Sequence, residues 1–566
     1  PDGYRYLQEY QGNPYPSMLF VIHSILLKKS IFMPQDKTCT ILKYELLAAP
    51  EKIRLDLRPI FAHRLNDDVC SEPDKHEFTH SLIGESSMEV NGRGYASYCS
   101  STSGTWSVKP LWFENIIYEQ DDRHDTPSVD QLWSPGYITN EISQGDVVYV
   151  ILSDTPETFS IAELTAMEKE AAERFENILE QANLPALSSA EQDMISSSYH
   201  LIDDRMSPLS PIYTGYPSVE NDSRKAFIAL PGLTLATGRE NVAETALNFW
   251  MNKASESGWV MPQKIENDGH PIFEGADNGL WFVYAADKYI SHVGESRDTT
   301  EVCKALLAVV DRYLGGVTEL DLVCGDNGLL CLTNEEPARH WMYEKVAGET
   351  VVSRTGYLVE INALWYNALK VAEKNAAPDV AQKYASAALL CQKSFREIFW
   401  STEINGLYDF VNDTQGKKCA TIRPNQILAV SLPYSPLTED MSAKVFALCW
   451  NELYTTYGLR TLDPHDEKFK GRAEGRIDQK AKARMRGMAW PWLLGQFITA
   501  FLKLNPTQKD LAWAFIRPFN SHLRHSCLGG IAEVFDGTMP YRPHGDVLSA
   551  ASMGELLRVL QEDLKE

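Results

Sequence analysis

The chain has 566 residues, enough for about two to four domains, and its 44% hydrophobic and 23% charged residues are ordinary for a globular protein. Its net charge of −24 argues against a nucleic-acid or anionic-membrane partner, because both are bound through basic patches. An uncharged ligand such as a sugar is compatible with this charge. The 13 Trp and 25 Tyr favour a sugar weakly, since sugar rings stack on aromatic faces.

The ten cysteines are scattered, and no pair has C-x-x-C spacing. We therefore expect no zinc site. We also expect no other metal and no cofactor. In a chain of this length the cysteines are typical of reduced thiols in a cytoplasmic protein. No apolar run reaches the roughly 18 residues that a membrane-spanning helix needs. A homo-oligomer is compatible with this composition.

Residues 1–155 alternate short β-favouring runs with turn residues, as in "TCTILKYELL", "SSMEVNGRGYASYCS" and "DVVYVILSD". Between Lys52 and Leu57, apolar and charged residues alternate with a period of two, which is typical of a strand with one buried face. The pattern predicts an antiparallel all-β domain of the sandwich type.

Residues 156–566 have a helical pattern instead. The stretch "IAELTAMEKEAAERFENILEQA" is long and amphipathic and follows the cap candidate Ser160. Further helices are expected over residues 190–201, 224–236, 241–254, 278–290, 300–314, 358–374, 380–399, 424–432, 441–457, 488–504 and 552–564. About a dozen helices joined by Gly- and Pro-rich loops indicate a closed ring of hairpins, an (α/α)6 barrel, although periodicity alone also allows an open solenoid.

Six motifs occur in order in the helical region: "FIALPGLTLATGREN", "VEINALWYNAL", "IRPNQILAVSLP", "GLRTL", "WPWLLGQF" and "IAEVFDG". Together they resemble the amylo-α-1,6-glucosidase module of glycogen debranching enzymes. The stretches "GYRYL", "KKSIFM" and "LRPIFAHR" are similar to that family's β-sandwich domain. The resemblance thus covers essentially the whole chain.

The resemblance implies a multidomain β plus α architecture, with an N-terminal antiparallel β-sandwich and a C-terminal (α/α)6 barrel like that of glucoamylase. It implies inverting hydrolysis of α-1,6-linked glucose at the branch points of glycogen or a related branched α-glucan. Family members also carry a further stretch before "GYRYL", so we expect the first strands of the sandwich to be missing here.

The family's catalytic base motif, E-x-F-D-G, matches "EVFDG" and implies Glu533 as the base. Inverting glycosidases pair such a base with an acid ~6.5–9.5 Å away. The family's acid is the Asp of W-M-D, and the matching loop "HWMYEK" has Tyr343 in that place. A tyrosine with a pKa near 10 is a poor proton donor, so we expect impaired activity. Glu344, one residue along, is the alternative donor.

Other family motifs have changed around the expected pocket. The family's D-W-G-R-D is "NDSRK" here, which keeps Arg224 and ends in Lys225, and Y-H-Q-G is "RMRG". The substrate-binding residues that the remaining matches imply are Arg224, Asp277, Trp341, Arg354, Glu360, Arg460 and Trp490. Asp277 would also suit a helix N-cap, Glu360 a buried ion pair and Arg460 a loop brace.

Two classes of function follow. The first is a debranching α-1,6-glucosidase with an altered acid, and the second is a non-catalytic relative that binds glucan or acts as a regulatory subunit. A trehalase- or glucoamylase-type hydrolase is a weaker alternative, because the ordered motifs fit debranching better. The chain has neither the length nor the βα pattern for the TIM-barrel domain of a 4-α-glucanotransferase.

Overall fold

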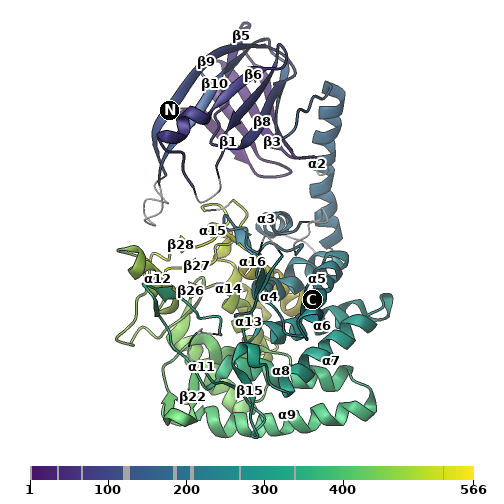
Figure 1. The fold of residues 1–566 in the computed structure, drawn as a ribbon, viewed down its shortest axis with the longest axis vertical. Helices are drawn as coiled ribbons and strands as arrows, with labels where there is room; N and C mark the ends of the chain where they lie inside the picture. Colours follow the sequence, from purple (N-terminus) through teal and green to yellow (C-terminus); the bar gives the residue numbers. More distant parts are fainter. Residues whose placement is uncertain are drawn as a thin grey trace. The chain divides into compact units, whose positions relative to one another are not determined.

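The computed structural model describes all residues except 1–2, 35–36, 65–67, 119–127, 183–187, 204–209, 267–268, 335, 337–338, 527 and 566, and the side chain of residue 477. It divides into two compact units, Pro1–Ile178 and Leu179–Glu566 (Figure 1). Within the described part of the chain, every helix is too short or too polar to cross a membrane. The nine described cysteines are free thiols, as the sequence predicts.

The first unit contains two antiparallel sheets. Their strands are β1 (Leu7–Gln11), β2 (Ser17–Ile22), β3 (Ile25–Phe32), β4 (Cys39–Ala48), β5 (Ile53–Leu57), β6 (Thr79–Leu82), β7 (Ser87–Gly92), β8 (Tyr95–Ser101), β9 (Thr105–Ile117), β10 (Val129–Ile142) and β11 (Val147–Ser153). The larger sheet has the order β1-β2-β3-β4-β11-β8-β7-β6, and the smaller has the order β5-β10-β9.

The two sheets enclose one apolar core. Met88 and Val90 of β7 lie in the same buried cluster as Trp106 of β9 and Trp133 and Ile138 of β10. Along β7 the buried positions alternate with more exposed ones, as expected for a strand with one face toward the core. The predicted antiparallel β-sandwich is confirmed.

Helix α2 (Ile161–Ala182) follows the sandwich strands. Ser160 accepts a hydrogen bond from the Glu163 N–H, and the Glu163 carboxylate accepts one from the Ser160 N–H. This reciprocal pair is a capping box, which fixes where the helix begins. Leu164 then packs into the apolar cluster of Phe32 and Ile41, so the start of α2 is anchored on the larger sheet.

The second unit is helical. Its helices are α3 (Ser189–Ser198), α4 (Ser223–Leu233), α5 (Glu240–Glu256), α6 (Asn278–Val293), α7 (Thr300–Leu314), α8 (Val359–Asn375), α9 (Pro378–Phe399), η8 (Pro424–Ile427), α10 (Leu428–Ser431), α11 (Glu439–Leu453), α12 (Ile477–Met485), α13 (Trp492–Leu504), α14 (Lys509–Ile516), α15 (Phe519–His522), α16 (Ala550–Val559) and the π-helical η9 (Leu560–Leu564).

Helices α4, α6, α8, α10, α13 and α16 form an inner ring in which each packs on the next and α16 packs back on α4. Helices α3, α5, α7, α9, α11 and α14 pack against this ring. Because an outer helix returns the chain after each inner one, the inner helices run in the same direction. The contact of α16 with α4 closes the ring, so the predicted (α/α)6 barrel is confirmed and the open solenoid is excluded.

Two predicted helices are too long. The helix expected over 441–457 ends at Leu453, and the one expected over 488–504 begins at Trp492. The extra residues instead enter a five-stranded sheet that the sequence analysis missed: β24 (Tyr454–Thr455), β25 (Gly458–Arg460), β26 (Ala489–Trp490), β27 (Val534–Phe535) and β28 (Pro543–His544). Strands of two or three residues leave no periodic pattern in a sequence.

Glycines allow the two helices that close the ring to approach each other. A Cβ on Gly232 of α4 would overlap the carbonyl of Gly554 of α16. A Cβ on Gly554 would lie 2.6 Å from the backbone of Ala229. The closure of the ring therefore requires the absence of side chains at these two positions.

We expect Gly232→Ala to lower the free energy of unfolding by ~1–3 kcal/mol, because the added methyl group must push α4 away from α16. Gly315→Ala is the matched control, since Gly315 has a φ of −78° and the nearest atom to an added Cβ is 3.6 Å away. Denaturant unfolding followed by circular dichroism measures both variants. An unchanged midpoint for Gly232→Ala would contradict the tight α4–α16 contact.

Candidate active site

The residues singled out from the sequence gather where the inner helices begin. Arg224 and Lys225 lie in the first turn of α4, Asp277 immediately precedes α6, and Glu360 lies in the first turn of α8. Trp490 lies just before α13. Since the inner helices run in the same direction, their starts share one end of the barrel.

Glu533 is held in place by the backbone of its own sheet. Its N–H donates to the carbonyl of Asp546 at 2.8 Å, and the adjoining β27 pairs with β26. Gly545 has a φ of +69°, and a Cβ there would overlap the Glu533 carboxylate. Glycine suits both this left-handed backbone and the close approach.

The Glu533 side chain is only 8% exposed, and two cations contact its carboxylate. Arg484 Nη2 lies 3.0 Å from Oε2, and Lys225 Nζ lies 3.2 Å from Oε1. Burial raises the pKa of Glu533, but Arg484 and Lys225 outweigh burial and lower this pKa to about 2. Glu533 is therefore ionised at neutral and mildly acidic pH.

Glu344 shares Arg484 with Glu533, since Arg484 Nε lies 3.7 Å from Glu344 Oε2. Burial raises the pKa of Glu344; Arg484 opposes this rise, and the Glu533 carboxylate adds to it. One planar guanidinium bridges the two groups, so their oxygens lie at most about 9 Å apart, an upper limit that overlaps the ~6.5–9.5 Å of inverting pairs. Their environments push the two pKa values in opposite directions, as an acid and a base require.

Tyr343, which occupies the family's acid position, has other neighbours. It lies beside Lys345, whose pKa is raised first by Glu336 and then by Tyr343. Lys345 belongs to the short strand β17 (Lys345–Val346) and pairs with Glu336 at 3.1 Å. The structure thus brings Glu344 to Arg484 and Glu533, while Tyr343 lies against an exposed ion pair.

Three tryptophans form a cluster that contacts Arg484 through Trp490. The Arg484 guanidinium lies over the Trp490 ring, 5.2 Å from its centroid. Trp341 packs edge-to-face on both Trp490 and Trp492, at centroid distances of 5.6 and 5.3 Å. The Trp341 indole N–H donates to Asn425 at 2.8 Å, which fixes the ring's orientation. Trp341 is half-buried, so part of its surface remains available to a ligand.

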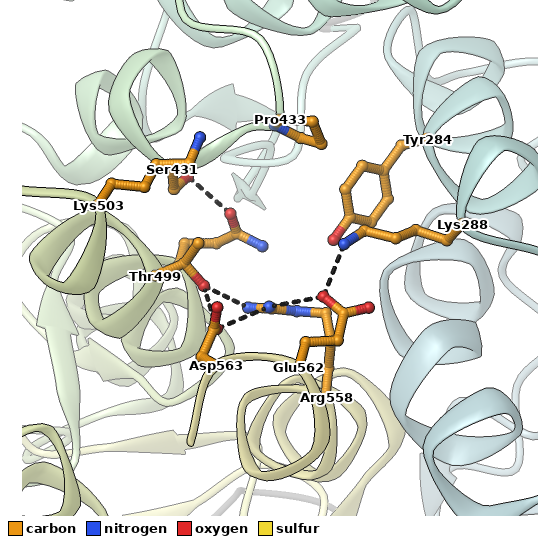
Figure 2. A pocket seen from close by; sticks show the side chains of 10 residues that line it. Tyr284, Lys288, Ser431, Pro433, Thr499, Lys503, Arg558, Glu562 and Asp563 are labelled. Carbon is orange, nitrogen blue, oxygen red and sulfur yellow. Dashed lines mark hydrogen bonds and ion pairs between the residues drawn. The ribbon is translucent and has the colours of Figure 1, made fainter. Parts of the chain in front are cut away.

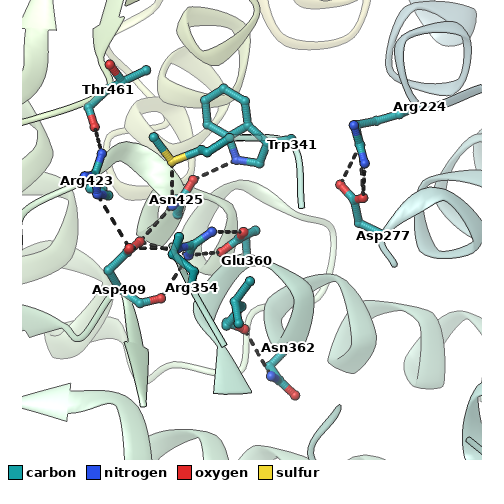
Figure 3. Close-up of polar contacts among 12 residues, drawn as sticks. Arg224, Asp277, Trp341, Arg354, Glu360, Asn362, Asp409, Arg423, Asn425 and Thr461 are labelled. Carbon is teal, nitrogen blue, oxygen red and sulfur yellow. Dashed lines mark hydrogen bonds and ion pairs between the residues drawn. The ribbon is translucent and has the colours of Figure 1, made fainter. Parts of the chain in front are cut away.

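Arg354 lies at the centre of a buried ion-pair network (Figure 3). Its guanidinium donates to both oxygens of Glu360, at 2.5 and 2.7 Å, and to both oxygens of Asp409, at 2.8 and 2.9 Å. All three side chains are at most 2% exposed. Asp409 also accepts from Asn425 at 2.7 Å, which joins this network to Trp341.

Three further predicted residues are engaged with protein groups. Arg224 donates to both oxygens of Asp277 at 2.7–3.0 Å, and Asp277 makes no side-chain cap bond to α6 (Figure 3). Arg460 donates to the carbonyls of Gly537, Tyr454 and Glu452, so it braces the loops around the five-stranded sheet.

The sequence analysis missed His340, which precedes Trp341. Its side chain is 2% exposed, and both ring nitrogens lack a hydrogen-bond partner among the described residues. Burial holds its pKa well below the ordinary value, and Arg354, Arg224 and Arg423 add to this effect. A neutral imidazole with unused hydrogen-bonding capacity therefore lies near Arg354, Arg224 and Arg423.

A cation site is not needed to explain the acidic groups nearby. Among the described residues, Glu452, Asp463 and His465 place their potential ligand atoms within 4.8 Å of one another. The His465 ring is 81% exposed and pairs with Asp463 at 2.9 Å, which accounts for the grouping as a surface ion pair.

The fold of the second unit is the six-hairpin (α/α)6 barrel found in glycoside hydrolases. A solved bacterial glucoamylase, complexed with acarbose, has the same fold, with a TM-score of 0.64, 12% identity, and coverage of 99% of this chain and 86% of that one. The sequence profile described as amylo-alpha-1,6-glucosidase matches residues 195–558, and that described as glycogen debranching enzyme N terminal matches residues 1–149. The chain belongs to the amylo-α-1,6-glucosidase family of glycogen debranching enzymes. No curated protein matches it.

We expect Arg354→Met to lower the free energy of unfolding by about 3–5 kcal/mol, because Glu360 would remain buried without a cation and Asp409 would keep only the more distant Arg423, at 3.6 Å. Arg476→Met is the control, since the Arg476 side chain is 87% exposed and should contribute little. Urea unfolding of both variants measures the difference. A loss below 1 kcal/mol for Arg354→Met would contradict the structural role given to this network.

Proposed function

We propose that this protein hydrolyses α-1,6-linked glucose at the branch points of glycogen or a related α-glucan, and does so slowly. The observation that carries the proposal is the pair Glu344 and Glu533, which share Arg484 and have pKa values moved in opposite directions. The family membership and the acarbose complex of the glucoamylase-like neighbour support a glucan substrate.

In this proposal Glu344 is the general acid and Glu533 the general base. The raised pKa of Glu344 favours the protonated form, which can donate to the leaving oxygen. Glu533 is ionised and can take a proton from the attacking water. Arg224, Asp277, Trp341 and Trp490 remain candidates for sugar contacts.

Slow turnover follows from the cations around Glu533. A carboxylate with a pKa of about 2 is a weak base, since Arg484 and Lys225 stabilise its ionised form. Both cations also disfavour the positive charge that develops on the sugar ring in the transition state. Arg484 further bridges the two carboxyl groups and covers Trp490, so a sugar must displace it.

The same cations favour the second candidate function, binding of glucan without turnover. A site whose base is neutralised by two cations can retain ligand contacts and lose the chemistry. Glucose release from a branched limit dextrin separates the two candidates, with binding of the same dextrin measured in parallel. Binding without release of glucose would support the non-catalytic role.

We expect Glu344→Gln to lower kcat on limit dextrin by ~10²–10⁴, because the leaving oxygen would lose its proton donor. Tyr343→Phe is the matched control and should retain nearly full activity, since Tyr343 lies beside Lys345. Glu533→Gln serves as the inactive reference. If Tyr343→Phe abolished activity and Glu344→Gln did not, the assignment of the acid would be wrong.

The pH profile of kcat/KM tests the same assignment. Glu344 must be protonated, so activity is present below its raised pKa and is lost as the pH rises through it. Glu533 must be ionised, so activity is lost only as the pH falls toward about 2. We therefore expect an acidic optimum, and the residual activity of Glu344→Gln should lack the alkaline limb. A flat profile up to neutral pH in the unmodified protein would contradict this pairing.

A further inference from the structure

A cavity of about 470 Å³ lies at the opposite end of the barrel, where the inner helices end (Figure 2). Its walls come from α6, the end of α10, α13, and α16 with η9. The side chains of Lys288 and Glu562 are 24% and 31% exposed, which places them where the cavity meets the surface. The volume is that of an ordinary small-molecule site.

The carboxylates in the cavity wall are already paired. Glu562 accepts from Lys288 at 2.6 Å and from Arg558 at 3.3 Å. Asp563 accepts from Arg558 at 3.1 Å and from Thr499 at 2.6 Å. Arg558 is 2% exposed, so its ion pairs with these carboxylates form the floor of the cavity.

The wall also contains an unused donor, the hydroxyl of Tyr284. Tyr284 is only 4% exposed, and its hydroxyl makes no hydrogen bond within the described part of the chain. Figure 2 shows this hydroxyl directed into the cavity. This hydroxyl can therefore donate a hydrogen bond to an acceptor that binds in the cavity.

Lys503 supplies a second donor and an unbalanced charge. Its ammonium donates to the carbonyls of Val430 and Leu432 at the end of α10 and has a third N–H. Within the described residues, no carboxylate forms an ion pair with Lys503. Arg558 also pairs with the buried Glu555 at 2.9 Å, and Lys288 pairs with Glu562. Among the described residues, Lys503 is therefore the cation of the wall that has no carboxylate partner.

We propose that this cavity binds a small organic oxyanion, a phosphate ester or a carboxylate. The oxyanion accepts hydrogen bonds from Tyr284 and Lys503 and lies near the charge of Lys288. Its acceptor oxygens match the donors that remain in the wall, whereas the carboxylates there already have their partners. A neutral sugar would leave the charge of Lys503 uncompensated.

Calorimetric titration of the full chain tests this proposal, with inorganic phosphate, glucose 6-phosphate and acetate as probes and glucose as the neutral control. We expect saturable binding of at least one anion and none of glucose. Acetate binding as tightly as phosphate would identify a carboxylate site, and binding of the phosphates alone would identify a phosphate site. Either result supports the oxyanion assignment.

Two variants locate the binding. Tyr284→Phe should weaken the anion about tenfold and leave the melting temperature of the free protein unchanged, because the lost hydroxyl has no protein partner. Lys503→Met should weaken it by at least as much. Lys304→Met, on the outer helix α7 with a side chain 67% exposed, is the control and should bind the anion like the unmodified protein.

Three results would overturn the proposal. They are no saturable binding of any anion up to about 10 mM, unchanged affinity in both Tyr284→Phe and Lys503→Met, or glucose binding as tightly as the anions. The titration needs no turnover, so its failure is distinct from a failure of the proposed glucosidase activity.

Discussion

The barrel depends on the contact between its first and last inner helices, α4 and α16. Gly232 and Gly554 let the two backbones approach where any side chain would overlap. Because this contact closes the ring, the starts of all six inner helices meet at one end of the barrel. Residues as distant in sequence as Lys225 and Glu533 can then form an ion pair. The geometry of the candidate active site therefore depends on close helix packing between positions that carry no functional group.

The charges at that end of the barrel are arranged around arginines. Arg354 pairs with two buried carboxylates and holds the loop before α8, which is a structural task. Arg484 bridges Glu344 and Glu533, which are the groups that hydrolysis would use. The first arrangement stabilises the protein at no cost to chemistry. Under the proposed mechanism, the second ties the acid and the base to a cation that a sugar must displace, so ion pairs of the same kind differ in their consequence for activity at the two places.

Much of the fold could be predicted from the sequence, because long periodic segments and the ordered motifs determine the sandwich and the barrel. The helix α7 was predicted with its observed bounds, Thr300–Leu314. The five-stranded sheet was missed, since its strands are too short to show a period. The resemblance pointed to Tyr343 and Glu533, but only the folded chain shows that Glu344 faces Arg484. His340 was missed because a lone histidine next to a tryptophan has no pattern of its own.

The π-helical turn η9 explains how one guanidinium can serve two acids in succession. Arg558 contacts Glu562, four residues later, and Asp563, five residues later. In an α-helix the position five residues on is rotated by ~140°, whereas in a π-helix the repeat runs from i to i+5. The widened turn therefore brings both carboxylates to the same face. A relative with one residue fewer between Val559 and Leu564 could keep every charged side chain and still lose these ion pairs. The spacing of the two carboxylates along the helix, and not their number, determines whether both face Arg558.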